Sequence, residues 1–170
     1  MPIRKPKPSD IDGAPLDAIE LAYRTRLGAF RRVAAAIIGQ PDLARDAVQE
    51  AFATAVRQRH GFRREGSLEG WLWRIVVNAA RDQRRSDRRL EERLESPPEL
   101  SHNGTGEVDD VRALFSLLPE RQRLALFLRY YADLDYEAIA QALEIRIGTV
   151  GSTLSAARAN LRSLLEEVRT

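Results

Sequence analysis

The chain of 170 residues contains no cysteine and only two histidines. Without cysteine neither a disulfide nor a thiolate metal site can form, and two histidines argue against a multi-histidine metal site. No apolar run approaches the roughly 20 residues that a membrane-spanning helix needs. The basic N-terminal residues also lack the apolar core of a secretory signal. These absences predict a soluble, cytoplasmic protein without membrane insertion, disulfides or bound metal.

The residue patterns of catalysis are missing as well. The sequence shows no nucleophile paired with a base, no glycine loop that would cradle a phosphate and no metal-ligating cluster. We therefore expect no catalytic residue, no cofactor and no enzymatic activity.

No segment alternates apolar and polar residues with a period of two between turns, which predicts an all-α fold with essentially no sheet. Residues 1–15 are rich in proline and aspartate and predict a disordered arm. Residues 96–110 combine Pro-Pro, Asn-Gly and Thr-Gly with excess negative charge, which is typical of a flexible linker. The sequence thus predicts two small helical domains, at residues 16–95 and 111–170.

Helical periodicity places the individual helices. We expect helices at residues 16–38, 43–59 and 71–94 in the first domain and at 111–118, 120–131, 136–143 and 148–168 in the second. Asp42 and Asp135 are the expected N-caps of the helices that follow them. The residues expected on the buried side of the first helix are Leu21, Leu27, Phe30, Val33, Ala34 and Ile37.

The helix beginning at residue 71 has two opposite faces. Its apolar face comprises Leu72, Ile75, Val76, Ala79 and Ala80. The other face, which we call the cationic stripe, comprises Arg74, Asn78, Arg81, Arg85 and Arg88. Like charges at i, i+4 repel one another, so a row of guanidinium groups indicates an anionic partner.

The second domain contains the pattern of a helix-turn-helix. A short apolar helix at residues 136–143 is followed by a turn at 144–147 and by a helix whose inward residues are Val150, Leu154, Ala157 and Leu161. In DNA-binding proteins of this kind the second helix enters the major groove. The pattern alone also fits an ordinary helical hairpin with no role in nucleic-acid binding.

Several short motifs in order resemble one known family. They are DAVQEAF at residues 46–52, WLWRIVVN at 71–78, LPE at 118–120, LR at 128–129, YEAIA at 136–140 and GTV at 148–150. The chain resembles sigma factors of the sigma-70 family, extracytoplasmic-function (ECF) group, over residues 18–168. Members of this group have two domains, called region 2 and region 4, joined by a flexible linker.

The resemblance implies a protein that binds bacterial core RNA polymerase, directs it to promoters and helps to melt the DNA. It implies that Asp46, Gln49 and Glu50 contact the clamp helices of the largest polymerase subunit. We call these three residues the carboxylate surface, and its Asp and Glu side chains would pair with basic residues of the polymerase. Arg45 stands where an acid is common in the family.

The resemblance also gives the cationic stripe a ligand, the non-template strand of the minus-ten element. Arginines would neutralise phosphates, and Asn78 would read the edge of an unstacked base. The loop at residues 61–70, with Phe62, Arg63 and Arg64, would close over that base. Trp73 would stack on a base, whereas Trp71 is expected in the core.

The recognition helix departs from the family pattern, in which basic residues follow Gly-Thr-Val. Gly151, Ser152, Thr153 and Ala156 stand there instead. Fewer cations mean weaker phosphate binding and a flatter salt dependence. We therefore expect weak or altered recognition of the minus-thirty-five element. The residues expected to contact it are Arg146, Thr149, Ser152, Thr153 and Arg158.

Two rival interpretations remain at this point. A sigma-like decoy would occupy core polymerase without initiating; the cation-poor recognition helix favours it and the intact cationic stripe opposes it. A transcription factor that uses only the helix-turn-helix would leave the first domain unexplained. An anti-sigma protein is a common partner in the family, and nothing in this sequence identifies one.

Overall fold

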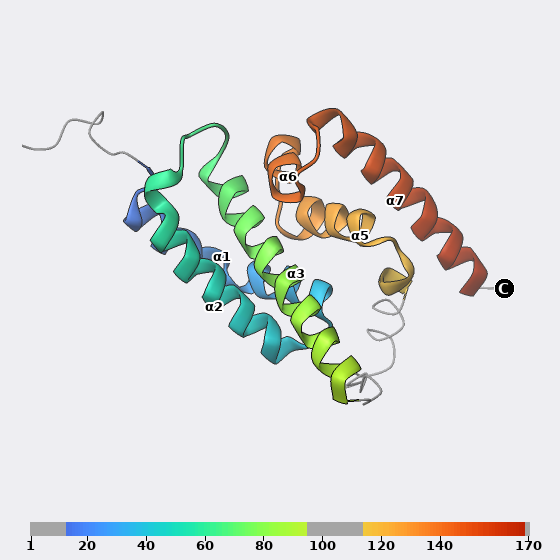
Figure 1. Ribbon diagram of the computed structural model, residues 1–170. Helices are drawn as coiled ribbons and strands as arrows, with labels where there is room; N and C mark the ends of the chain where they lie inside the picture. The colour runs from blue at the N-terminus through green and yellow to red at the C-terminus, as the bar shows by residue number, and fades with distance from the viewer. Residues whose placement is uncertain (1–12, 95–113, 169–170) are drawn as a thin grey trace, which may run out of the picture.

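The computed structural model describes residues 13–94 and 114–168, and within these ranges the only regular elements are helices. The predicted arm at 1–15 and linker at 96–110 lie almost wholly outside the described residues. The first domain contains α1 (Leu16–Ile38), α2 (Pro41–Gln58), the 3-10 turn η2 (Arg59–Gly61) and α3 (Leu68–Leu94). The second contains α5 (Glu120–Leu126), the π-helical η3 (Phe127–Tyr131), α6 (Tyr136–Leu143) and α7 (Ile147–Val168). The all-α prediction is confirmed (Figure 1).

An aromatic cluster holds α1, α2 and α3 together. Phe30 of α1 lies with its ring centroid 4.3 Å from that of Trp73 and 5.0 Å from that of Phe52. Tyr23 packs edge-on against Phe52 at 4.9 Å. Large rings that meet at such angles bury much apolar area and add a favourable ring–ring interaction. One ring from each helix therefore fixes the packing of the first domain.

Two predictions for the first domain are wrong. Leu21 is 63% exposed, and Ile19 is buried in its place. Leu21 lies nine residues before Phe30, or roughly 180° around an α-helix, so the two side chains point in opposite directions. Asp42 does not cap α2, which begins at Pro41 with Gln40 at the cap position. Proline favours this first helical position because it has no N–H to leave unsatisfied.

The second domain forms the predicted helix-turn-helix from α6 and α7. The Asp135 carboxylate accepts a hydrogen bond from Ala138 N at 2.8 Å, which confirms it as the N-cap of α6. Glu144 ends α6 in the left-handed conformation, with φ 55°. Val150, Leu154 and Ala157 of α7 are buried as predicted.

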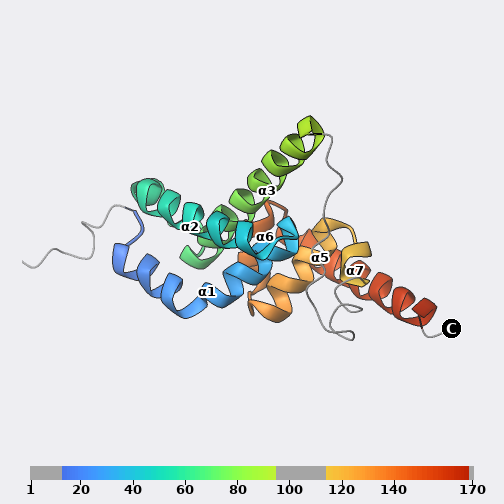
Figure 2. The same cartoon turned by 90° about the horizontal axis from the view of Figure 1, so that it is seen from below.

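In Figure 2 the C-terminal end of α3 projects beyond the other helices. The two domains pack closely against each other through α3 and α6. Glycine at position 70 allows this approach, since a Cβ there would lie 2.3 Å from Gln141 Oε1 and 3.1 Å from Ala138 Cα. One apolar core continues from the first domain into the second. The sequence suggested two bodies separated by a linker, whereas the structure joins them along an apolar seam.

The aromatic cluster gives a direct test of the fold. Replacing Phe30 with Ala should lower the free energy of unfolding by about 3–5 kcal/mol, because it removes a buried ring and leaves a cavity beside Trp73. Urea titration followed by circular dichroism measures this change. The control Leu21→Ala should alter stability by less than about 0.5 kcal/mol, and a larger loss would show that Leu21 packs in solution.

Candidate nucleic-acid and polymerase interface

The cationic stripe of α3 is divided between solvent and the second domain. Arg85 and Arg88 are exposed, while Arg74, Asn78 and Arg81 are half-buried. Arg85 pairs with Asp82, one turn earlier on the same helix. The end of the stripe nearer the C-terminus of α3 is therefore accessible, and its middle faces the second domain.

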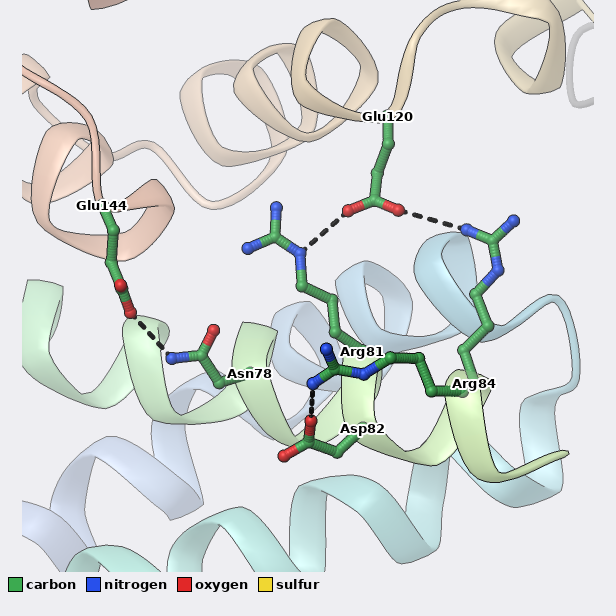
Figure 3. Close-up of polar contacts among 7 residues, drawn as sticks. Asn78, Arg81, Asp82, Arg84, Glu120 and Glu144 are labelled. Atoms are coloured by element: carbon green, nitrogen blue, oxygen red, sulfur yellow. Dashed lines mark hydrogen bonds and ion pairs between the residues drawn. The ribbon is translucent and has the colours of Figure 1, made fainter. Parts of the chain in front are cut away.

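One carboxylate holds two guanidinium groups at the middle of α3 (Figure 3). Glu120, the first residue of α5, accepts from Arg81 Nε at 2.8 Å on Oε1 and from Arg84 NH1 at 3.1 Å on Oε2. The three side chains are 31–38% exposed, so solvent screens this pairing less than a fully exposed one. Each oxygen of this one carboxylate thus accepts a hydrogen bond from a different arginine, as two oxygens of a phosphate group would.

Burial, with the neighbouring Arg84, lowers the pKa of Arg123 on α5, and the charge of Glu120 acts in the opposite direction. Glu120 is therefore the anion between cations of both domains. Without its charge, Arg84 of α3 would face Arg123 of α5 uncompensated.

A second acid from the turn of the helix-turn-helix reaches α3. Asn78 Nδ2 donates to Glu144 Oε1 at 2.8 Å (Figure 3). The same Glu144 lies at the edge of a groove of about 570 Å³ between α2 and α3. Polar residues from both helices line this groove, including Glu50, Thr54, Arg74, Asn78 and Asp82.

Two aromatic residues expected at the DNA surface are instead buried. Trp73 has no exposed surface and stacks on Phe30, so its assignment as a base-stacking residue is corrected. Phe62 is 9% exposed, with its ring centroid 5.3 Å from that of Trp71. Both rings supply the apolar area that a small three-helix domain needs, so neither is presented to a base in this conformation. Trp71 is buried as expected.

The loop between η2 and α3 presents its arginines outward. Arg63 and Arg64 are exposed, and Arg64 takes a left-handed conformation with φ 57°. The Ser67 hydroxyl accepts from Gly70 N at 2.9 Å and so caps the start of α3. The loop therefore lies beside the N-terminal end of the cationic stripe, as the sequence suggested.

The carboxylate surface on α2 faces solvent. Asp46, Gln49 and Glu50 are all exposed, and Asp46 lies 3.7 Å from Arg45 Nε. Arg57 NH2 donates to Glu50 Oε1 at 2.7 Å. This hydrogen bond, together with the positive charge of Arg57, lowers the pKa of Glu50. The surface is thus accessible to a basic partner, and its Glu50 carboxylate is held in the ionised form.

The residues expected to contact the minus-thirty-five element, on α7 and just before it, differ in their exposure. Arg146, Ser152 and Arg158 are exposed, and Thr149 is half-buried. Thr153 is only 8% exposed, so its assignment as a DNA contact is corrected. Thr153 lies between Val150 and Ala157 at helical spacing, and this places it on the face that packs into the domain.

Sequence reasoning missed the residues that join the domains. Arg84 lies beside the stripe that periodicity defined, and Glu120 was recognised only as part of a motif. Glu144 carried one local signal, an acid directly after the helix at 136–143 where a glycine or asparagine usually ends a helix. Their pairing depends on how α6 packs on α3 and α5 on α1, and no periodicity within one helix contains that information.

Among the described residues, no cluster of His, Cys, Asp or Glu could hold a metal ion. In the same ranges, no helix is both long enough and apolar enough to cross a membrane.

Comparisons with known proteins match both domains. Residues 22–90 match the family model of sigma-70 region 2, and residues 109–161 match that of sigma-70 region 4. The chain is 31% identical over 147 residues to the RNA polymerase sigma-E factor of Streptomyces avermitilis, covering 84% of this chain and 82% of that protein. It is 30% identical to the ECF RNA polymerase sigma factor EcfG of Rhodopseudomonas palustris, covering 80% and 78% respectively. The sigma factor RpoE, solved in complex with the anti-sigma factor NepR from Bartonella quintana, superposes with a TM-score of 0.72 at 25% identity, covering 89% of this chain and 98% of that one.

The Glu50–Arg57 pair generates a pH prediction. Because Arg57 favours the ionised carboxylate, the pKa of Glu50 should lie below the usual value of about 4.3. The stabilisation from this pair should be present above that usual value and lost as the pH falls through the lowered pKa. A carboxyl-carbon NMR titration measures the pKa of Glu50. Arg57→Ala should return the pKa of Glu50 toward its usual value, whereas Arg45→Ala should leave it unchanged; equal pKa values in wild type and Arg57→Ala would contradict the pairing.

Proposed function

The chain belongs to the ECF group of sigma-70 family RNA polymerase sigma factors, and we propose that it binds bacterial core RNA polymerase and directs it to specific promoters. Its two domains supply separate surfaces for this task. The observation that carries the DNA-binding proposal is the pair Arg81 and Arg84, which hold two oxygens of one anionic group at 2.8 and 3.1 Å.

The carboxylate surface on α2 is the proposed contact to core polymerase. Asp46, Gln49 and Glu50 are exposed and lie on the side of α2 opposite its buried residues, such as Val48 and Phe52. Ionised carboxylates with free surface steer a basic partner toward the domain and fix its orientation. The hydrogen bond from Arg57 keeps Glu50 ionised without burying it.

The cationic stripe of α3 is the proposed site of the non-template strand at the minus-ten element. Arg85 and Arg88 offer exposed guanidinium groups to phosphates, and Arg63 and Arg64 of the loop before α3 are exposed as well. Asn78 carries both a donor and an acceptor for the edge of an extruded base. The polar groove between α2 and α3 lies next to Asn78 and has room for such a base.

Promoter melting under this proposal requires no catalytic chemistry. Capture of an extruded base offsets an unstacking cost of a few kcal/mol, and contacts to the single-stranded backbone hold the opened strand. The protein acts as a binding factor, and the polymerase carries out synthesis.

The helix-turn-helix of α6 and α7 is the proposed reader of the minus-thirty-five element, with few cations at the groove. Arg146 and Arg158 are exposed on α7 or beside its start, and Ser152 and Thr149 present hydroxyl groups near its N-terminus. Arg158 is partly engaged, since it donates to Leu154 O and to the Tyr130 hydroxyl. An anti-sigma protein is a further proposed partner, in line with the solved complex of the relative RpoE.

Transcription with purified components tests the initiation role. Run-off transcription on fragmented genomic DNA, with and without this protein, should reveal new discrete start sites. Replacing Arg85 and Arg88 with Ala should reduce those starts about tenfold by removing phosphate contacts, while binding to core polymerase stays unchanged. Replacing Asp46 and Glu50 with Ala should instead weaken binding to core about tenfold.

Glu20→Ala on α1 is the matched control for the carboxylate surface, because Glu20 has a comparably exposed side chain. It should leave binding to core polymerase and transcription unchanged. Tight association with core but no discrete starts would favour the decoy, which the cation-poor α7 supports. Absence of both binding and starts would refute the proposed function.

Binding to duplex DNA across a salt series tests the second domain. For a fragment carrying the upstream element, Arg146→Ala should reduce the slope of log K against log salt by about 1, as expected for one lost phosphate contact. Thr153→Val should leave the slope unchanged because Thr153 is buried. If the wild-type slope is steep and Arg146→Ala does not change it, cations other than Arg146 make the phosphate contacts.

A further inference from the structure

We infer that the groove between α2 and α3 is a binding site for a guanine base, with Arg74 at one end and two carboxylates at the other. The inference rests on the proposed function of the cationic stripe, because it names the base that α3 takes from an opened strand. A free guanine nucleotide offers the same base, and a competition experiment separates the two sources.

The groove has a polar row on each of its two helices. The two rows are Glu50, Thr54 and Gln58 on α2, and Arg74, Asn78 and Asp82 on α3. Within each row the residues recur every four positions, which spaces them about 6 Å apart along the helix axis. A short connection joins α2 to α3, and the two helices run antiparallel (Figure 1). Arg74 therefore lies toward the same end of the groove as Gln58, and Asp82 lies toward the end that holds Glu50.

The Arg74 end of the groove carries a positive charge without a partner. The Arg74 side chain is half-buried, and it forms no hydrogen bond or ion pair with residues 13–94 or 114–168. By contrast, Arg81, Arg84 and Arg85 of the same helix each pair with a carboxylate. Burying part of a guanidinium group costs free energy unless acceptors bind it, so this end of the groove favours a ligand with two acceptors side by side.

The opposite end of the groove carries two carboxylates with oxygens that can still accept. Arg57 and Thr54 both donate to Oε1 of Glu50. Arg85 donates to Oδ1 of Asp82. Each carboxylate thus retains its second oxygen, Oε2 or Oδ2, for a donor on a ligand.

The middle of the groove is uncharged and partly apolar. Ala47, Ile75 and Ala79 line it together with the side chains of Thr54 and Asn78. Apolar surface of this kind receives the flat face of a base, while polar groups at the ends fix the orientation of the base. The volume of about 570 Å³ lies within the usual range for small-molecule sites and admits a sugar and phosphate as well.

Guanine matches this order of charges. Its O6 and N7 atoms are adjacent acceptors, to which an arginine donates two hydrogen bonds, and its N1–H and N2 amino groups are donors that suit a carboxylate. Adenine places an amino group beside N7, where Arg74 would meet a donor, and thymine has no amino group for the carboxylates. Arg74 and Asp82 lie about 12 Å apart along α3. This distance leaves room for a base with a hydrogen bond of roughly 3 Å at either end.

The test measures binding of the full chain to fluorescein-labelled oligodeoxythymidine by fluorescence anisotropy, with dG, dA, dC or dT at one central position. The dG probe should bind about tenfold more tightly than the dT probe, within the discrimination that a bidentate arginine–guanine pair provides. Arg74→Gln should abolish this preference, and glutamine is a good helix former, so α3 should stay folded. The control Arg88→Gln should weaken all four probes equally and preserve the preference, because phosphate contacts carry no sequence information.

Base analogues test the two ends of the groove separately. 7-Deazaguanine lacks N7, and hypoxanthine lacks the N2 amino group. Each analogue should bind the wild type about fivefold more weakly than guanine does, as expected for the loss of one hydrogen bond. The loss caused by 7-deazaguanine should disappear in Arg74→Gln, and the loss caused by hypoxanthine should disappear in the double variant Glu50→Gln, Asp82→Asn.

Competition by mononucleotides identifies the source of the base. If guanosine 5′-monophosphate displaces the dG probe from wild type but adenosine 5′-monophosphate does not, the groove binds a free guanine nucleotide. If neither mononucleotide competes while the dG preference persists, the base comes from a strand whose phosphates also contact exposed arginines such as Arg85 and Arg88. Both results support a guanine site, and they differ only in the molecule that fills it.

Equal affinity of the wild type for all four probes would overturn the inference, as would a dG preference that persists in Arg74→Gln. Transcription with core polymerase keeps the two proposals apart. If wild type gives discrete starts but shows no dG preference, the guanine site is wrong and the sigma function stands. If the dG preference depends on Arg74 but wild type gives no starts with core polymerase, the guanine site stands and the proposed function fails.

Discussion

The packing of Trp73 against Phe30 sets the orientation of α3, and the other functional surfaces follow from it. With Trp73 in the core, Leu72, Val76 and Ala80 also face inward. Arg81 and Arg84 then lie toward the second domain, and Arg85 and Arg88 lie toward solvent. An aromatic contact in the core thus determines where the arginines lie, although none of them touches it.

The opposite face of α3 concentrates positive charge, and the molecule compensates it in two ways. Near the C-terminal end, Arg85 pairs with Asp82 on the same helix and remains exposed. In the middle, Arg81 and Arg84 pair with Glu120 from the other domain. The same helix therefore combines exposed arginines with arginines that pair with the second domain.

The second domain directs two acidic side chains at α3 and offers few cations on α7. Its recognition helix offers mainly small and hydroxyl side chains, and Thr153 is turned inward. Its acids Glu120 and Glu144 both point at α3.

The sequence by itself determined the helices, the two-faced character of α3, the helix-turn-helix and the Asp135 cap, because periodicity and capping depend on neighbours along the chain. The order of the motifs along the chain also indicated the family. Leu21 was wrongly expected to be buried, because helical periodicity shows which residues share a face but not which face packs against a partner such as Phe52. Trp73, Phe62 and Thr153 looked available for DNA because residue type does not reveal which side a small domain must bury. Only tertiary structure brought Glu120 to Arg81 and Arg84, since that pairing arises from the packing of the second domain against α1 and α3 and spans 39 and 36 residues of sequence.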